Sequence, residues 1–430
     1  MHCLRYALTA PGDICQILLS MSRSSAIITI GNEILLGRTL NTNLAWLASE
    51  LALAGVPVTY AIVVQDQREQ ILQALQDTWG KYDIVITTGG LGPTPDDITK
   101  ASIAEYFGKE LQFDPDVWDN VQMLFSRRNM PAPESNRSQA LVPAGFTALH
   151  NELGTAPGLC HQEGKRVFFA LQGVPTEMRH IYTRHIQPML PALYPEARRI
   201  TQKTLHSFGI SESALAELFY VSDISPQVNL AWLPQTGRVD LRFYGEDEPA
   251  VKQAVRSACE KIGHLIWGED DDTPADALYR CLKDKGLSLA VAESCTGGLI
   301  QAYLTEVAGI SDVFRGGVVA YHNDVKTGLL DVTSEVVIRE GAVCGEVARQ
   351  MAIGVRQALN SDVSIAITGI AGPAGGSPEK PVGLVWFAYC VYDKVFVEKA
   401  VFNGDRAGIR HKAAEMAILK LTRLLKEGTL

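Results

Sequence analysis

Residues 288–300 read SLAVAESCTGGLI, and this stretch decides the fold expected for the last third of the chain. An alternating apolar run ends at Glu293, Ser294 and Cys295 follow at once, and two glycines then open an amphipathic segment. The pattern predicts a β-strand that runs directly into a helix, with a hydroxyl or a thiol at the junction. A side chain at such a turn lies beside backbone N–H groups and the positive end of the helix dipole, which suits covalent catalysis on a carbonyl or phosphate binding. A tight turn built from small residues for packing has the same pattern, so position alone leaves both interpretations open.

The chain as a whole has the composition of a soluble globular protein, with 47% hydrophobic and 20% charged residues. Its 430 residues are too many for one ordinary core and predict about two to four domains. The net charge of −9 and the lack of a dense Lys/Arg run argue against nucleic acid as the main partner. No apolar run reaches the roughly 18 residues of a membrane span, so no membrane association is expected. The eight cysteines are scattered without a CxxC pair, which argues against structural zinc and favours a reducing, cytoplasmic location.

The N-terminal residues make a poor signal peptide, because Pro11, Gly12 and Asp13 interrupt the only weakly apolar region. A clear strand begins soon after them, and Met21 could equally be the true start. We expect residues 1–24 to be a disordered extension.

Residues 25–190 alternate short β-like and longer helical patterns, which predicts a mostly parallel sheet flanked by helices. A Pro-rich passage around 188–195 is typical of a linker or boundary. Expected strands lie at 26–30, 56–64, 83–90 and 166–173, and expected helices at 43–54, 68–80, 96–108, 116–129 and from about 176.

Residues 199–268 show a smaller pattern of strand, helix, hairpin and helix, which predicts a compact α+β module with its hairpin turning at Thr236-Gly237. The element order is KH-like, but a GxxG loop with basic flanks is missing, which argues against RNA binding. The acidic run 268–276 reads as a solvated boundary, with Thr273 as a helix N-cap and Pro274 as the first helical residue.

Residues 273–430 again alternate helix and strand, so we expect an α/β chain in which the small α+β, KH-like module joins two doubly wound α/β domains. Three glycine-marked turns follow strands in this region, namely AESCTGG, VVAYHNDVK (318–326) and AITGIAGPAGG (366–376). In a doubly wound sheet such turns gather along the carboxyl edge of the strands, where ligands bind. Further expected strands are 315–321, 363–369 and a hairpin within 383–402, and expected helices end at 285, begin at 297, cover 345–359 and run from about 406 to 426.

Several side chains on these turns are candidates for chemistry. A serine nucleophile needs a base, and Lys326 would serve if burial lowered its pKa, although a lysine there is also an ordinary surface charge. His322 is a second candidate base, but a histidine beside a tyrosine is more often structural or exposed. Thr368 and Gly369 end a buried strand, as oxyanion donors or helix caps do. Arg406, before the last helix, is either a phosphate partner or a surface arginine.

The C-terminal motifs resemble a known enzyme domain over 273–425. AESCTGG, GGVVAYHNDVK, AITGIAGPAGGSPEKPVG and NGDR, in this order and spacing, are similar to the nicotinamide-nucleotide amidase domain of the CinA (competence/damage-inducible protein A) family. The resemblance implies a serine amidohydrolase that converts nicotinamide mononucleotide (NMN) to nicotinate mononucleotide and ammonia without a metal or other cofactor. It also implies that Ser294 is the nucleophile and Lys326 its general base, with Tyr321 and Thr368 lining the site.

The same resemblance places other residues at or near this site. Cys295 is a rival nucleophile because thiolates are intrinsically more reactive, but the family pattern points to the serine. Cys344 stands where the family usually has serine, outside the two catalytic residues, so we expect little effect. The expected substrate-binding residues are Glu293, Thr296, Gly297, Gly298, Gly369 and Arg406.

A second set of motifs lies in the N-terminal region. From the residues alone, TTGGLGPTPDD (87–97) is a glycine-rich turn that leads into a helix headed by Asp96 and Asp97. Backbone donors in such a turn suit a phosphate and the paired carboxylates suit a divalent metal, although acids at a helix start are also ordinary dipole-favoured residues. Glu33 and Glu177 are candidate further acids. The expected phosphate-binding residues are Gly89, Gly90, Gly92 and Thr94.

These N-terminal motifs resemble the molybdopterin-binding-like domain that begins CinA proteins. The resemblance implies metal-dependent hydrolysis of ADP-ribose to AMP and ribose 5-phosphate. We expect the metal, Mg²⁺, Mn²⁺ or Co²⁺, to be held by Asp96, Asp97 and Glu33. Gln172 stands where the motif LPGVP usually has proline, and related domains bind molybdopterin without hydrolysing it, so a binding role stays open. The matching stretches are IGNEILLG (30–37), NTN (41–43), TTGGLGPTPDD (87–97), PESNRSQA (133–140), GTAPG (154–158) and LQGVPTEM (171–178).

The leading interpretation is therefore a cytoplasmic, homodimeric, bifunctional enzyme of pyridine-nucleotide recycling that acts on NMN and ADP-ribose. The competing interpretation is a non-catalytic protein that binds a pterin or nucleotide, or an interaction factor in competence or DNA-damage responses. The set of Ser294, Tyr321, Lys326 and Thr368 favours the enzyme, because a scaffold would not require it.

Overall fold

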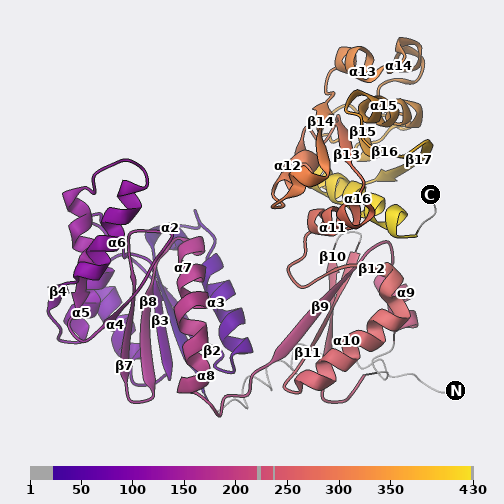
Figure 1. The fold of residues 1–430 in the computed structure, drawn as a ribbon. Helices are drawn as coiled ribbons and strands as arrows, with labels where there is room; N and C mark the ends of the chain where they lie inside the picture. The colour runs from indigo at the N-terminus through magenta and orange to yellow at the C-terminus, as the bar shows by residue number, and fades with distance from the viewer. Residues whose placement is uncertain (1–22, 220–223, 236–237, 428–430) are drawn as a thin grey trace. The chain divides into compact units, whose positions relative to one another are not determined.

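The computed structural model describes residues 23–219, 224–235 and 238–427, which form two compact units (Figure 1). The first unit runs to Thr201 and the second begins at Gln202, apart from residues 246–248, which belong to the first. Nearly all of the expected extension 1–24 and the expected hairpin turn at Thr236-Gly237 lie outside the described residues. No helix in the described ranges combines the length and apolar character that a membrane crossing needs.

The first unit is a three-layer α/β domain (Figure 1). Its six-stranded sheet contains β1 (Ser25–Ile30), β2 (Val58–Val64), β3 (Ile84–Thr88), β6 (Thr147–Leu149), β7 (Gly158–Glu163) and β8 (Arg166–Leu171) in the order β2-β1-β3-β8-β7-β6. The first four strands of this order pair in parallel, and β7 and β6 continue the sheet antiparallel. The central strands β1, β3 and β8 are rich in apolar residues because both of their faces are buried.

Helices cover the two faces of this sheet. The helices are α2 (Asn32–Leu35), α3 (Thr42–Leu53), α4 (Arg68–Thr78), α5 (Thr99–Tyr106), α6 (Pro115–Ser126), α7 (Pro175–Ile181) and α8 (Gln187–Leu193). α3 and α7 pack on one face and α4 and α5 on the other, so each face has its own apolar core. This sandwich leaves the carboxyl ends of the parallel strands open at one edge.

Four short strands in the first unit were not predicted from the sequence. β4 (Leu111–Phe113) and β5 (Leu141–Pro143) pair with each other. These two strands and β6 have only three residues each, too few for a period to show. β7 reads GLCHQE, which lacks the alternation of a half-buried strand. Its His161 is nevertheless buried, because its ring stacks on Phe146 with centroids 4.5 Å apart.

The Pro-rich passage expected near the end of the first domain is a helix rather than a linker. α8 contains Pro191 in its interior, and Pro188 occupies its first turn, where a missing N–H costs little. Leu190 and Tyr194 are buried in the core, and the Tyr194 hydroxyl donates to the backbone carbonyls of Asp83 and Lys165. The chain therefore continues in the first unit past 190.

The second unit begins with the small α+β module. Its sheet holds β9 (Thr201–Ser207), β10 (Asn229–Gln235), β11 (Arg238–Gly245) and β12 (Ile266–Glu269) in the order β10-β11-β9-β12, with α9 (Glu212–Leu218) and α10 (Glu248–Ile262). β10 and β11 form the expected antiparallel hairpin, whereas β12 was not predicted. The boundary that follows begins α11 (Pro274–Lys285) as expected, since Thr273 and Asp276 form a capping box.

The rest of the second unit is a second three-layer α/β domain (Figure 1). Its five strands are β13 (Leu289–Glu293), β14 (Phe314–Val319), β15 (Val363–Gly369), β16 (Leu384–Val391) and β17 (Lys394–Val401), in the order β14-β13-β15-β16-β17. The first three of this order are parallel, and β16 and β17 are the expected antiparallel hairpin. The helices are α11, α12 (Leu299–Thr305), α13 (Asn323–Leu330), α14 (Ser334–Glu340), α15 (Gly345–Ala358) and α16 (Arg406–Glu427).

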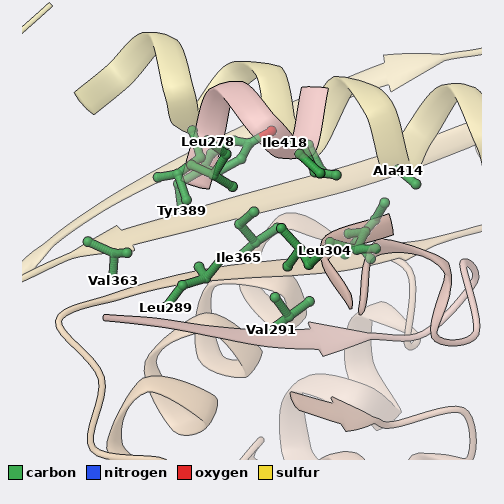
Figure 2. Close-up of a cluster of buried hydrophobic side chains, with 14 of the residues drawn as sticks. Leu278, Leu289, Val291, Leu304, Val363, Ile365, Tyr389, Ala414 and Ile418 are labelled. Atoms are coloured by element: carbon green, nitrogen blue, oxygen red, sulfur yellow. The ribbon is translucent and has the colours of Figure 1, made fainter. Parts of the chain in front are cut away.

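The opening stretch LAVAE owes its strand form to two different buried faces. Leu289 and Val291 lie in one apolar core with side chains of α11 and α16, as Figure 2 shows. Ala290 and Ala292 face the other core, which α15 fills. Alternate positions of a strand point to opposite faces, and burying one such leucine or valine contributes about 1.5–3 kcal/mol. The result is a central strand that delivers Ser294 to the open edge of the sheet.

Candidate active sites

The C-terminal domain has a cavity of about 220 Å³ where the parallel strands end. Because β13, β14 and β15 are parallel, the turns that follow them meet at one edge of the sheet. The structure brings together six of the predicted residues on the wall of this cavity: Ser294, Tyr321, Lys326, Thr368, Gly369 and Arg406.

The Ser294 turn is shaped by its two glycines. The Ser294 N–H donates to the carbonyl of Ile367 at 3.0 Å, so the β13–β15 ladder holds the residue in place. Gly297 and Gly298 adopt φ values of 61° and 94°, a region that strongly favours glycine. Neither glycine lines the cavity. They were expected to bind the substrate, but the structure places them in the turn and outside the cavity wall.

Glu293 lies behind the turn and is fully buried. Its carboxylate accepts hydrogen bonds from the backbone N–H groups of Gly298, Ile300 and Gln301 at 3.0–3.1 Å, and from the Gln301 side chain. These are the unpaired donors at the start of α12. Glu293 is thus a positioning residue rather than a substrate contact, and it closes this helix N-terminus to a phosphate.

Lys326 is buried on α13 with only 1% of its surface exposed. Its Nζ donates to the carbonyl oxygens of Ala320 at 2.7 Å and Tyr321 at 3.2 Å. Burial lowers the pKa of Lys326 below its ordinary value, which favours the neutral amine. A neutral amine has two N–H donors and one lone pair, and the two carbonyls take the two donors. The lone pair is left to accept a proton.

The structure argues against both alternatives, His322 as the base and Cys295 as the nucleophile. His322 caps α13, accepting from the N–H of Asp324 with Nδ1, and its side chain is 76% exposed and outside the cavity wall. Cys295 lines the cavity, but burial raises the pKa of its thiol to about 12, so it stays protonated near neutral pH. The site therefore favours the pair Ser294 and Lys326.

The rim and the far wall of the cavity are held by side-chain hydrogen bonds. Arg406 donates to the Tyr321 hydroxyl at 2.8 Å and to the carbonyl of Gly372 at 2.7 Å. Thr368 is fully buried, and its hydroxyl donates to the carbonyl of Ala342 at 2.9 Å, which fixes the loop that forms the far wall.

Thr296 and Gly369 were predicted to belong to this site, and Asn323 was not. Thr296 is fully buried and outside the cavity wall, so it is not a substrate contact. Gly369 lies against β16, where a Cβ would come within 2.7 Å of the Leu384 carbonyl oxygen. Asn323 lines the cavity and was missed, although it stands between Tyr321 and Lys326 in a motif quoted above.

The first unit has its own cavity, of about 350 Å³, after β3 and β8. Of the four residues expected to bind phosphate, Gly90 and Gly92 line this cavity, whereas Gly89 and Thr94 do not. A Cβ on Gly92 would lie 2.4 Å from a carboxylate oxygen of Asp97, so a larger residue would require the Asp97 side chain to move.

The acidic residues at this cavity differ from the predicted set. α5 begins at Thr99, so Asp97 precedes the helix and turns back to accept from the N–H and hydroxyl of Thr94 at 2.9 and 2.5 Å. Asp96 and Glu33 are exposed and outside the cavity wall. Glu177 lines the cavity together with Asp97. In the described ranges no three His, Cys, Asp or Glu side chains gather to hold a metal, so the predicted trio is not assembled.

Two carboxylates on one wall still fit a hard divalent cation. Mg²⁺ is commonly bound by one or two carboxylates and completed by substrate phosphates and water. Asp97 and Glu177 would be those ligands. Glu177 is oriented by Asn151, a fully buried residue whose Nδ2 donates to it at 2.7 Å.

Both α/β domains of the chain match known domain families. Residues 271–425 match the "CinA C-terminal domain" and residues 26–192 the "Probable molybdopterin binding domain". A CinA-like protein of Gemmatimonas aurantiaca is 43% identical over 410 residues, which cover 92% of this chain and 95% of that protein.

The chain belongs to the CinA family.

Two further proteins named for this family are similar to the chain, one along most of its length and one along about a third. A CinA-like protein of Syntrophomonas wolfei is 39% identical and covers 94% of this chain and 100% of its own. Among solved structures, the competence/damage inducible protein CihA of Agrobacterium tumefaciens is 40% identical over 35% of this chain and 93% of its own, with a TM-score of 0.35. The two domain matches and the two full-length relatives confirm the family resemblance of both domains.

Proposed function

We propose that the C-terminal domain is a serine amidohydrolase that converts NMN to nicotinate mononucleotide and ammonia. The observation that carries the proposal is the buried Lys326, which lines the same cavity as Ser294. Its two backbone partners take both N–H donors of the neutral amine and leave the lone pair of its nitrogen free. A hydroxyl nucleophile needs such a base, and a lysine of lowered pKa can supply it.

In the proposed mechanism Lys326 takes the proton of the Ser294 hydroxyl as the oxygen attacks the carboxamide carbon. The carbonyl oxygen becomes an oxyanion, and the N–H of Cys295, the next residue along the chain, is the backbone donor that we assign to it. The C–N bond then breaks, Lys326 returns the proton to the leaving nitrogen, and ammonia departs. Water then attacks the ester carbon and gives a proton to Lys326. As the bond between this carbon and Ser294 Oγ breaks, Lys326 returns the proton to Oγ, which restores the serine hydroxyl and releases the nicotinate product.

We assign the phosphate of the substrate to Arg406. This guanidinium lies on the cavity wall, and arginine is suited to phosphate oxygens. The start of α12 is an unsuitable phosphate site because Glu293 already occupies its donors.

The test is incubation of the full chain with NMN while ammonia and nicotinate mononucleotide are measured. Ser294→Ala should abolish turnover, and Cys295→Ser should retain it, because the thiol is not the nucleophile. Unchanged turnover in Ser294→Ala would refute the assignment. A lack of product from the parent protein would favour the non-catalytic alternative.

We further propose that the N-terminal domain hydrolyses ADP-ribose to AMP and ribose 5-phosphate with a divalent metal, Mg²⁺, Mn²⁺ or Co²⁺. The support is the pair of carboxylates, Asp97 and Glu177, in one cavity beside a glycine-rich turn. A cation bound there would offset the negative charge of the diphosphate during P–O cleavage. The chain's own contribution is to hold both carboxylates in place through Thr94 and Asn151.

We also propose that the protein works in the cytoplasm as a homodimer. The described cysteines, all of them free thiols, suit a reducing compartment. Light scattering of the purified full chain tests the dimer.

A further inference from the structure

Gln172 lies on the wall of the N-terminal cavity with 4% of its surface exposed. Its backbone is fixed, because the Thr88 hydroxyl donates to the Gln172 carbonyl at 2.8 Å and Asn43 donates to Thr88 in turn. The position of the side chain is therefore set by the sheet beneath it.

The orientation of the Gln172 amide is also fixed. Its Nε2 donates to the carbonyl oxygen of Ala156 at 2.6 Å. Turning the amide over would place two oxygens against each other, so the nitrogen must face Ala156 and Oε1 must face away. Oε1 is buried and has no hydrogen-bond partner in the described residues.

A buried acceptor without a donor is unusual, and such groups often await a ligand or water. We propose that Gln172 Oε1 accepts a hydrogen bond from the ligand of this cavity and thereby selects a ribose hydroxyl adjacent to a diphosphate. This inference rests on the ADP-ribose hydrolysis proposed above.

The neighbours of Gln172 indicate which part of the ligand it meets. The Ala156 carbonyl accepts from Gln172 and also from Asn151 Nδ2, at 2.8 Å, and Asn151 in turn holds Glu177. Gln172 and Glu177 therefore belong to one hydrogen-bonded wall. If Glu177 holds the cation that binds the diphosphate, we expect Gln172 Oε1 to meet the ribose attached to that diphosphate.

Calorimetry on the full chain tests this inference. The probe is α,β-methylene ADP-ribose with Mg²⁺, because its bridging carbon prevents turnover. Gln172→Met, which removes the acceptor at similar length, should weaken binding by about five- to tenfold, the range of one hydrogen bond. Gln172→Pro, the residue of the related motif, should weaken it similarly. Gln162→Met is the matched control. The Gln162 side chain is exposed on β7, and its only hydrogen bond in the described chain goes to the Gly164 carbonyl.

Two further measurements separate selection from a purely structural role. The thermal midpoint of Gln172→Met should stay close to that of the parent, because Ala156 keeps its bond from Asn151. The parent should prefer ribose 5-phosphate over its 2-deoxy analogue, or AMP over 2′-deoxy-AMP, and Gln172→Met should lose that preference.

The outcomes distinguish the two proposals. Equal probe affinity in the parent, Gln172→Met and Gln172→Pro would overturn the role of Gln172 and leave the hydrolase proposal standing. A fall in affinity that follows a fall in thermal midpoint, with the deoxy preference unchanged, would also overturn it. A parent protein that does not bind the probe would overturn both.

Discussion

Arg410 on α16 holds the backbone carbonyl of Thr296 with two N–H groups, Nη2 at 2.6 Å and Nε at 3.2 Å. Thr296 follows Ser294 by two residues, so the last helix of the chain fixes the turn that carries the proposed nucleophile. Arg410 does not line the cavity, which makes it a positioning residue.

Replacing Arg410 by alanine should lower the kcat of NMN deamidation by about ten- to a hundredfold with little change in KM, because small misplacements of a reacting group are costly. Arg423→Ala is the control, since Arg423 lies on the same helix and pairs with Glu427. Steady-state kinetics on both variants check this. A change in KM alone would contradict a positioning role.

The amidase rate should depend on pH through Lys326. Burial lowers the pKa of Lys326, and the neutral amine is the base. The value of kcat/KM should therefore rise with pH and then level off, and the midpoint of the rise should lie below the ordinary lysine pKa of about 10.4. Lys326→Arg keeps a positive charge at all these pH values and should lose about 10²- to 10⁴-fold in rate. Lys326→Met serves as a folding control because it places an uncharged chain in the same buried space. A rate that is independent of pH, or an active arginine variant, would count against the base.

The two neighbouring aspartates of the N-terminal turn should behave differently. Asp97→Asn should abolish metal-dependent ADP-ribose hydrolysis, since Asp97 lines the cavity, whereas Asp96→Asn should retain it, since Asp96 is exposed outside the wall. EDTA should stop AMP release and leave ammonia release from NMN unchanged. Equal loss in both aspartate variants would contradict this arrangement.

Lys100 should make the stability of the first unit depend on pH. Burial lowers its pKa to about 8, and its Nζ bonds only to the carbonyls of Ser138 and Gln139 in the described chain. Between that pKa and the ordinary lysine value the unfolded chain binds more protons, so the free energy of unfolding rises with pH. From pH ~7.5 to ~9.5 the gain is about 2 kcal/mol.

Lys100→Met should lack this rise. Urea unfolding of the parent and the variant at both pH values measures the difference, which cancels the contributions of other groups. Parallel pH dependence in the two proteins would show that Lys100 is not the cause.

The strand, turn and helix around Ser294 could be predicted because their signals are local. Alternating Leu289 and Val291, two glycines and a following amphipathic run are all visible within a dozen residues. The meeting of Lys326 and Thr368 with this turn was also predictable, since both follow parallel strands. The burial of Lys326 was not, because it depends on helices that contact α13 from elsewhere in the chain.

The acids were harder to place from sequence. Glu293 could be taken as a ligand contact, since no pattern shows that its carboxylate folds back onto the first turn of α12. Asp96 and Asp97 looked equivalent at a helix start, but the helix begins later, at Thr99, and only Asp97 reaches the cavity. Glu177 reaches the same cavity from helix α7, which is distant in sequence, so spacing alone could not select it over Glu33.

The hydrogen bonds of Lys326 have a consequence for how this site tolerates change. Its two partners are main-chain oxygens of Ala320 and Tyr321, not side chains. The direction of the amine is thus set by the path of the backbone, and not by the side chains of Ala320 and Tyr321. Loop insertions that bend the turn would be far more damaging than most single substitutions within it.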